Sequence, residues 1–335
     1  MLSFETLRKP GYLVPLLILM LLALVPLVAT ATGQSFYIAF FARIIIYAIA
    51  ATALNLALGF GGLVSLGHAL FIGLGAYSVA IPAFHGISNG WIHLAVVIVS
   101  CGLVGLLTGA VSLRTSGIGF IMITLAFAQM GYFVFVSLKQ YGGDDGTPVA
   151  APSEFFGINL GQTVPLYWVA LAVLCLVIWW GARLRASPFG MVLRGSRQNA
   201  RRINAIGFRS SRYQLTAYVM SAILCGVAGM LLANLTAFAS PATLSWIVSG
   251  DLIVMIVLGG LGTVFGPLLG ALAFLGAEEV LKGLTESWPA VFGFAIFLIA
   301  LLRTAGLAGM LAKLGKLRRG QKVDPLPLAA VGDQV

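Results

Sequence analysis

Several polar or ionisable side chains lie within long apolar stretches of this 335-residue chain, where they could serve a solute path. Asn55, Ser65 and His68 share one such stretch, and Gln129 and Asp251 lie in others. In a membrane such groups are costly enough to indicate a role in transport, or a hydrogen bond between helices. For His68 the second interpretation is a neutral imidazole that holds a turn. No second metal ligand stands at helical spacing from it, so the sequence predicts no metal site.

Other side chains of chemical interest give weaker indications. His85 and His93 fall in an expected outer loop, where we expect them to be solvated or interfacial. Cys101, Cys175 and Cys225 fall within apolar blocks without C-x-x-C spacing, which favours small apolar fillers over a disulfide or zinc site. No G-x-x-x-x-G-K-[ST] motif occurs, so the chain has no P-loop with which to hydrolyse a nucleotide. We therefore expect no catalytic residue and no bound cofactor.

Composition predicts the elements that must position these residues. Hydrophobic residues make up 60% of the chain and charged residues only 9%, which indicates an all-α polytopic membrane protein with one transmembrane domain over residues 1–335. Most of the apolar blocks have about the length of a membrane-crossing helix. We expect about ten helical elements, some short or broken, at residues 12–30, 36–58, 63–84, 92–113, 117–138, 165–182, 214–237, 248–265, 267–281 and 289–302.

The first 33 residues also resemble a cleavable signal peptide. Arg8 and Lys9 precede an apolar run that ends in the small-residue sequence "ATATG". An uncleaved first helix is favoured, because the run is long for a signal and contains Pro15 and Pro26.

Charge predicts the orientation of the helices. Segment 183–212 holds eight arginines and no acid, and six further bases follow between Arg303 and Lys322. With Arg8, Lys9 and Arg114, 17 of the 20 basic residues then fall on one side, which the positive-inside rule assigns to the cytoplasm. Both termini are therefore expected to be cytoplasmic, with a loop at 184–212 and a basic tail at 304–335. Because the basic residues lie where the positive-inside rule expects them in a membrane protein, the net charge of +10 does not indicate nucleic-acid binding.

The weakest part of this count is residues 251–281. They could form one interrupted helix that crosses once, but the basic tail would then lie outside. Two short spans, or a re-entrant pair that returns to its starting side, keep the tail in the cytoplasm. The sequence is compatible with either two short spans or a re-entrant pair.

Two glycine-rich segments interrupt apolar stretches in the two halves of the chain. They read "GFGGLVSLGHALFIGLGAYS" at 59–78 and "LGGLGTVFGPLLG" at 258–270. Close helix packing is one explanation, and the pairs Gly105/Gly109 and Gly266/Gly270 have the G-x-x-x-G spacing for it. The other is a pair of broken helices around a substrate path, where freed backbone groups face a cavity. Neither explanation excludes the other.

The basic loop has a local pattern of its own. Ser187 followed by Pro188 fits a helix start, and Ser196 is a candidate N-cap for a second short helix that ends at Gly207. That second helix would be amphipathic, so it could lie on lipid or fit a groove in a partner protein. If transport is driven by ATP, the motor must be another subunit.

Three stretches together resemble the permease subunits of ATP-binding cassette (ABC) importers for branched-chain amino acids, of the LivM type. They are "ALNLALGFGGLVSLGHALFIGLGAYS" from Ala53, "SPFGMVLRGSRQNARRINAIGF" from Ser187 and "VMIVLGGLGTVFGPLLGA" from Val254. The resemblance implies a multi-pass protein of the bacterial inner membrane. It also implies a second related permease subunit, two cytoplasmic ATPase subunits that bind the ATP, and a periplasmic solute-binding protein.

The resemblance also assigns roles to residues. Contact with the ATPase is implied for residues of the loop that match the family: Pro188, Phe189, Gly190, Arg194, Arg197, Asn199, Ala205 and Gly207. Gln198 and Ala200 stand where the family commonly has glutamates, and Arg201 and Arg202 where it has small apolar residues, so this surface should be more basic. With the polar candidates above, the expected translocation path contains Asn55, Gly62, Ser65, Gly67, His68, Gly73, Gln129, Gly259, Gly260 and Gly262.

The sequence thus predicts a non-catalytic permease subunit for a small polar or zwitterionic solute. Branched-chain amino acids come first, and urea or organic acids remain open, because related permeases serve them. The alternative is a stand-alone secondary transporter or channel, for which a carboxylate buried in mid-helix would be the signature. Only Asp251 could serve as that carboxylate.

Overall fold

The computed structural model describes residues 10–284, 287, 289–294, 306–307 and 309. Arg8 and Lys9, most of the predicted last apolar block and nearly all of the basic tail lie outside these residues. The described chain is mostly helical, in agreement with the all-α prediction. Its long α-helices are α2 (Pro10–Thr32), α3 (Ser35–Asn55), α4 (His68–Phe84), α5 (Gly90–Ser112), α6 (Ile118–Ser137), α7 (Thr163–Ala186), α8 (Pro188–Ala205), α9 (Ser210–Thr236), α10 (Trp246–Gly259) and α11 (Gly266–Leu284).

Short elements occupy the connections. A π-helical turn, η1 (Leu56–Phe60), extends α3, and the 3₁₀ turns are η2 (Lys139–Tyr141), η3 (Gly143–Asp145) and η4 (Pro241–Leu244). Two antiparallel pairs of two-residue strands lie in loops: β1 (Thr147–Pro148) with β4 (Phe238–Ala239), and β2 (Glu154–Phe155) with β3 (Ile158–Asn159).

Five described helices are long and apolar enough to cross a membrane. They cover Phe36–Phe60, Gly90–Ser112, Ile118–Ser137, Thr163–Ala186 and Ser210–Thr236. Three shorter apolar helices lie at Leu17–Thr30, His68–Phe84 and Trp246–Gly259. Helices satisfy their own backbone polar groups, which a bilayer requires of any spanning segment. The chain is therefore a polytopic helical membrane protein, while the count of ten crossings stays a prediction.

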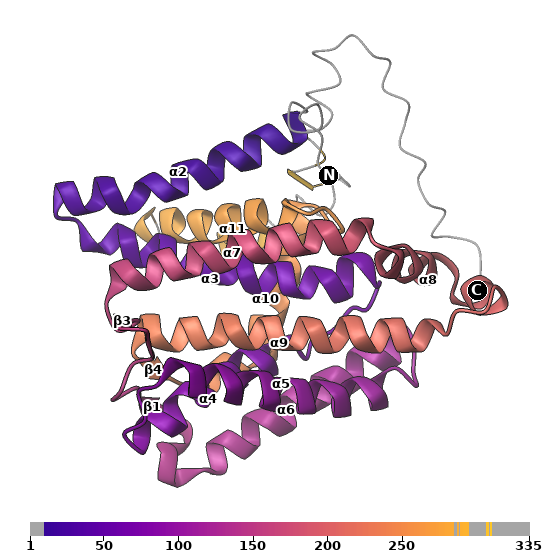
Figure 1. Ribbon diagram of the computed structural model, residues 1–335, viewed down its shortest axis with the longest axis horizontal. Coiled ribbons are helices and arrows are strands. Elements are labelled where there is room, and N and C mark those ends of the chain that lie inside the picture. The colour runs from indigo at the N-terminus through magenta and orange to yellow at the C-terminus, as the bar shows by residue number, and fades with distance from the viewer. Residues whose placement is uncertain (1–9, 285–286, 288, 295–305, 308, 310–335) are drawn as a thin grey trace.

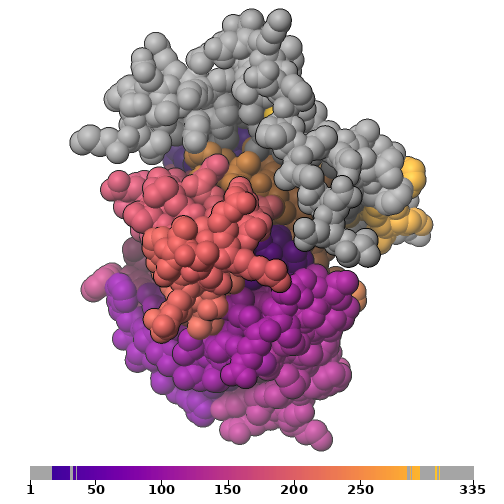
Figure 2. Space-filling view, turned by 90° about the vertical axis from the view of Figure 1, so that its right-hand side faces the viewer, coloured from indigo at the N-terminus to yellow at the C-terminus, as the bar shows by residue number. Residues whose placement is uncertain are grey.

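The helices run between two ends of the molecule, with α8 at one end and the paired strands at the other (Figure 1). The predicted cytoplasmic loop and the predicted outer loops thus lie at opposite ends. Figure 2 looks onto the α8 end, where the segment around α8 and the start of α9 projects toward the viewer. Helix α9 is central and packs against α3, α4 and α5.

Helix α4 is short and nearly all of its side chains are buried. A Cβ added to Gly75 would collide with the backbone of Gly226, and one added to Gly229 would collide with the backbone of Ile72. The backbones of α4 and α9 therefore touch, which only glycine allows. Because protein surrounds most of it and buries its first residue, His68, this 17-residue helix can lie at membrane depth with little of its backbone exposed.

The predicted G-x-x-x-G contacts are present. Gly105 and Gly109 of α5 face Ala222 and Tyr218 of α9. Gly270 of α11 lies against the carbonyl of Met255 in α10, and Gly266 lies against Gly260. Since Met255 and Gly270 touch although 15 residues separate them, the chain folds back between α10 and α11. The option of one interrupted helix over 251–281 is therefore wrong, and the paired segments are correct.

A buried polar clasp holds the outer loop, and it corrects the prediction for His93. His93 is fully buried in the first turn of α5. Its Nδ1 accepts a hydrogen bond from Ser153 Oγ (2.7 Å), and its Nε2 donates to Ile87 O (3.0 Å). Asn234 of α9 accepts from Ser153 N (2.8 Å) and donates to Ser153 Oγ (3.1 Å). Apolar neighbours do not reveal a polar partner 60 residues away, so the sequence alone suggested a solvated ring.

Candidate functional site

Both glycine-rich segments are broken helices. In the first, α3 passes into the π-helical turn η1, and α4 begins only at His68. In the second, α10 ends at Gly259 and α11 begins at Gly266. Gly62 (φ +72°), Gly260 (φ +119°) and Gly262 (φ +75°) adopt backbone conformations that favour glycine. The two explanations of the glycines therefore apply to different positions: these three permit the breaks, whereas Gly75, for example, permits close packing.

Asn55 joins the two breaks. Its Nδ2 donates to Thr263 O (2.9 Å), and its Oδ1 accepts from Gly262 N (3.0 Å), so its amide pairs with backbone that no helix satisfies. Asn55 is only 2% exposed, which makes both bonds costly to lose. A Cβ at Gly59 would collide with the Asn55 side chain and would approach Gly262 N to 2.8 Å. Segments some 200 residues apart thus form one junction.

Arg197 of α8 contacts this junction from the predicted cytoplasmic side. Its Nη1 donates a hydrogen bond to Gly59 O. Its aliphatic stem covers Gly62, where an added Cβ would lie 2.7 Å from Arg197 Cγ. The same Nη1 lies 3.6 Å from the Cβ position of Gly262. One side chain of the loop therefore touches both broken helices.

The first half of α8 is anchored to the bundle. Ser187 Oγ accepts from Gly190 N (3.2 Å), with Pro188 in the first turn, which is the predicted helix start. Gly190 packs against the backbone of Leu184 and Arg185, and a Cβ there would collide with both. The guanidinium of Arg194 donates to Arg185 O (3.2 Å). On its inner face, Leu193 is fully buried in a small cluster with Leu56, Phe60 and Ala217.

The second half of α8 starts at a different residue from the one predicted. Ser196 is 5% exposed and its Oγ donates to Leu193 O (2.7 Å), so it lies inside the first helix and caps nothing. The backbone of Asn199 is non-helical (φ −156°, ψ 97°), and its Oδ1 accepts from Arg202 N (2.9 Å). Asn199 therefore kinks α8 and caps its second half. Serine and asparagine are similarly good N-caps, so the sequence alone does not distinguish Ser196 from Asn199. The burial of Ser196 inside the first helix excludes it as the cap.

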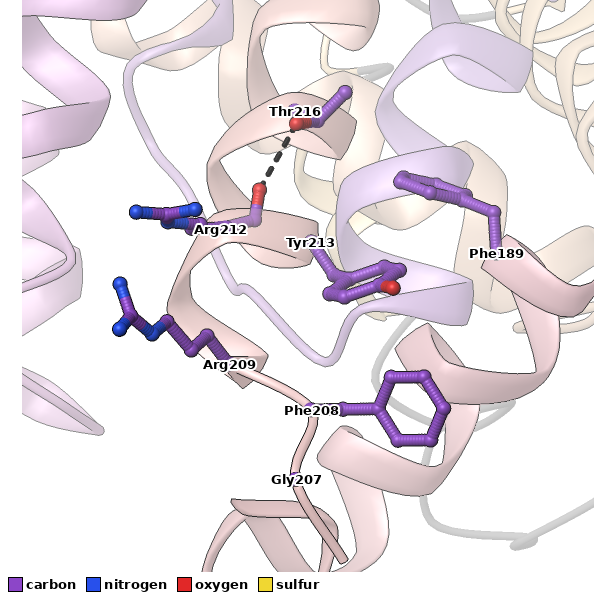
Figure 3. A pocket seen from close by; sticks show the side chains of 7 residues that line it. All are labelled: Phe189, Gly207, Phe208, Arg209, Arg212, Tyr213 and Thr216. Atoms are coloured by element: carbon purple, nitrogen blue, oxygen red, sulfur yellow. Dashed lines mark hydrogen bonds between the residues drawn. The ribbon is translucent and has the colours of Figure 1, made fainter.

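The outer surface of this segment is basic and partly apolar. Arg201, Arg202 and Ala205 are exposed, as are Ile206 (64%) and Phe208 (42%). A cleft of about 560 Å³ adjoins it between α8 and the start of α9 (Figure 3). Three rings lie on one side of the view and two arginines on the other. The cleft is lined by Phe189, Gly207, Phe208, Arg209, Arg212, Tyr213 and Thr216.

Sequence analysis missed Phe208 and Tyr213 as members of this surface. The Tyr213 ring lies 5.4 Å from that of Phe189 and 6.1 Å from that of Phe208, between ring centroids. The available signal was an aromatic residue directly after Gly207, the glycine that follows the helix end with φ +94°. Gly207 thus turns the chain so that residues after α8 face residues at its start.

His68 forms a hydrogen bond between helices. Its Nε2 lies 2.9 Å from Ser221 Oγ in α9. Since Ser221 Oγ donates to Ala53 O (2.6 Å), the proton of the shared bond belongs to Nε2 of His68. The next residue, Ala69, donates its N–H to Ser249 Oγ in α10 (2.8 Å). The start of α4 is therefore joined to α9 and α10, as the interhelical interpretation of His68 predicts.

The remaining predicted path residues do not all lie at this start of α4. Ser65 is buried and accepts from Gly67 N (3.1 Å). Gly67 lies against Thr124 of α6, and Gly73 faces the side chain of Leu244. Gly259 packs against Gly266 and Gly270 of α11, and the carbonyl of Gly260 lies against Gly266. Half-buried Gln129 lies five residues beyond Thr124, and no hydrogen bond joins it to the junction among the described residues.

Comparison with known proteins gives the family. The family described as "Branched-chain amino acid transport system / permease component" matches residues 36–301, which include both breaks and α8. The chain is 26% identical to the high-affinity branched-chain amino acid transport system permease protein LivM of Escherichia coli K12, over 82% of this chain and 70% of that protein. It is also 26% identical to LivH of that strain, over 76% and 88%.

A more distant relative serves a different solute. The autoinducer 2 import system permease protein LsrC of Yersinia enterocolitica is 24% identical, over 67% of this chain and 54% of that protein. No solved structure matches the chain. All these relatives are permease components of import or transport systems, not enzymes. With its helical membrane architecture, the chain is an inner-membrane permease subunit of an ABC import system, and it belongs to the family of branched-chain amino acid transport system permease components.

Proposed function

We propose that this permease subunit carries branched-chain amino acids inward and that partner ATPases drive it through α8. The observation that carries this proposal is the position of Arg197, which donates a hydrogen bond to Gly59 and lies beside Gly262, because it joins the exposed basic helix to both broken helices. A partner that moves α8 would therefore move the junction at Asn55, and with it the ends of α3 and α10. That is the kind of two-state element alternating access requires.

The proposed docking surface is the outer face of residues 184–212. Ala205, Ile206 and the basic pair Arg201 and Arg202 are exposed there, whereas Arg194 and Leu193 face the bundle. Five of the predicted contact residues thus divide into two groups. Gly190, Arg194 and Arg197 hold α8 on the membrane domain, whereas Ala205 and Gly207 are exposed and free to meet a partner. An amphipathic helix that enters a partner's groove fits this division.

The proposed assembly has a second permease, two ATPases and a periplasmic binding protein. LivM and LivH are both permease proteins of a branched-chain amino acid transport system, and this chain is similar to each, which supports a paired permease. Branched-chain amino acids are the proposed solutes for the same reason. The ATP would be bound by the ATPases, since the sequence has no P-loop motif. The path would involve the junction and the predicted polar residues at the start of α4.

The proposed topology has ten crossings in one domain, with both termini and the tail 304–335 in the cytoplasm. In this proposal, the nine described helices other than α8 supply the crossings up to Leu284. They would alternate so that Arg114 and α8 share one side, and the loop from Lys139 to Leu160 would lie on the other. The apolar block at 289–302 would supply the tenth crossing.

Recovery of an ATPase with the extracted complex tests the proposal. Ala205→Glu adds a negative charge to the exposed docking face and should release the ATPase while the membrane domain stays folded. Gln140→Glu makes the same change of charge on the exposed outer loop and should retain it. Equal recovery from both variants would refute docking at α8. Proton-driven uptake by this chain alone would instead support the stand-alone transporter.

A leucine uptake assay tests the solute. Proteoliposomes that contain both permeases and the ATPases, supplied with the binding protein, should accumulate leucine when ATP is present. Uptake of urea but not of leucine would reject the proposed solute and leave the ABC mechanism intact.

A further inference from the structure

Three charged side chains lie at a similar depth in the described membrane helices. Arg43 is eight residues after the start of α3, Asp251 five after the start of α10, and Glu278 six before the end of α11. At 1.5 Å per residue, these positions lie about 8 to 12 Å from the helix ends. The opposite ends of α3 and α10 meet at the Asn55 junction, so the three charges lie toward the predicted outer side.

The charges are not equally paired. Glu278 accepts a hydrogen bond from Lys282 Nζ and lies 4.0 Å from Arg43 Nη2. The Arg43 guanidinium also lies 5.7 Å from the centre of the Tyr47 ring. Asp251 is close enough for its charge to interact with those of Glu278 and Arg43, but it forms no ion pair with any described residue. Among the described residues, Asp251 therefore lacks a direct partner.

The face of α10 beside Asp251 is partly uncovered. Ile247 is 58% exposed and Val257 is 44% exposed, whereas Asp251 and Val254, which lie between them in the sequence, are half-buried. The exposed face of α5 is different, because Val99 and Leu103 and their neighbours along the helix are apolar. An apolar face suits lipid, whereas an ionisable side chain in a membrane normally faces protein or a water-filled cavity.

We propose that this face of α10 lines the aqueous solute path, and that Asp251 and Arg43 contact the ammonium and the carboxylate of a zwitterionic solute. The carboxylate of Asp251 is complementary to the ammonium group of such a solute, and the guanidinium of Arg43 is complementary to its carboxylate. This inference rests on the proposed function, since it places the solute of that transporter in the outer half of the path. Glu278 has its closest cation in Lys282, and its 4.0 Å ion pair with Arg43 holds α11 beside α3, so Asp251 and the remaining donors of the Arg43 guanidinium are left for the solute.

Cysteine labelling tests the exposure of this face without any solute. In a Cys175→Ala background, Ile247→Cys and Val254→Cys should react with a membrane-impermeant methanethiosulfonate applied from outside the assembled complex. Cys101 and Cys225 are buried and should stay silent. The controls Val99→Cys and Leu103→Cys, on the apolar face of α5, should not react. If the α10 positions react no faster than these controls, that face meets lipid or a partner helix and the proposal fails.

Leucine transport tests the charge contacts. In the reconstituted complex, Asp251→Asn should raise the KM for leucine by about tenfold or more, as the loss of a charged hydrogen bond implies. Asp251→Glu should recover part of the affinity, and Arg43→Gln should also raise KM. A variant complex that is recovered whole but keeps the wild-type KM would overturn the charge contacts. The labelling experiment tests whether α10 lines the path even if leucine is not the solute. Failure of this inference can therefore be distinguished from failure of the proposed function.

Discussion

The guanidinium of Arg197 donates a hydrogen bond to the carbonyl oxygen of Gly59, 138 residues earlier in the chain. Gly59 lies in the π-helical turn η1, where the regular helix of α3 gives way to the break. Carbonyl oxygens at a helix end need partners from outside the helix, and here a charged side chain of the basic loop supplies one. The contact fixes the position of α8 relative to the broken helices.

Replacement of Arg197 should uncouple transport without releasing the ATPase. Arg197→Ala removes a charged hydrogen bond that is worth about 1.5–3 kcal/mol, so movement of α8 would pass less fully to the junction. We expect leucine uptake per ATP hydrolysed to fall about tenfold, measured in proteoliposomes. Arg114→Ala removes an exposed arginine outside the docking face and should leave this ratio unchanged. Loss of the ATPase from the Arg197→Ala complex would instead assign Arg197 to the docking surface.

Replacement of Asn55 should separate the two breaks. Asn55→Ala leaves the N–H of Gly262 and the carbonyl of Thr263 without their partner, which costs about 1–3 kcal/mol for each group that stays buried. Thermal unfolding of the purified subunit, followed by size-exclusion chromatography, should show a lower midpoint. Thr52→Ala, one turn earlier, removes only a bond to its own helix and is the matched control. Equal midpoints for the two variants would mean that the junction adds no stability.

Replacement of glycine by alanine should have opposite effects on stability at a helix contact and at an open helix position. Gly229→Ala places a methyl group against the backbone of Ile72, so we expect overpacking to cost about 1–3 kcal/mol. Gly181 lies inside α7 with nothing within 4 Å of an added Cβ. Gly181→Ala should therefore be neutral or stabilising by up to about 1 kcal/mol. A thermal midpoint that is unchanged in Gly229→Ala would show that α4 and α9 can separate freely.

The clasp around Ser153 should hold the outer loop. Ser153→Ala removes the donor to His93 Nδ1 and the acceptor of Asn234 Nδ2, both within the buried clasp. We expect faster hydrogen exchange, by about tenfold or more, at backbone amides of residues 147–160. Ser116→Ala alters an exposed serine in another loop and should have no effect there. Identical exchange in both variants would assign the ordering of the loop to its strand pairs instead.

Much of the architecture could be predicted from the sequence, because membrane helices are encoded locally. Apolar length indicates a span, and the basic segment around Arg197 stands apart from the acids, which suggests sidedness. Ser187 with Pro188 marked the start of α8 for the same local reason. The glycines near 59 and 260 also indicated interruptions, because glycine is a poor helix former that permits positive φ.

What the sequence could not give is which residues meet across the chain. Asn55 was one polar residue among several, and only its contacts with Gly262 and Thr263 distinguish it. His93 and Ser196 were misjudged because burial depends on neighbours that lie far away in sequence. By itself the sequence determined a helical membrane permease with two glycine-rich interruptions and a basic loop. Only the tertiary structure decided that both interruptions and the loop converge at Arg197, since that contact depends on how α3, α8 and α10 pack together.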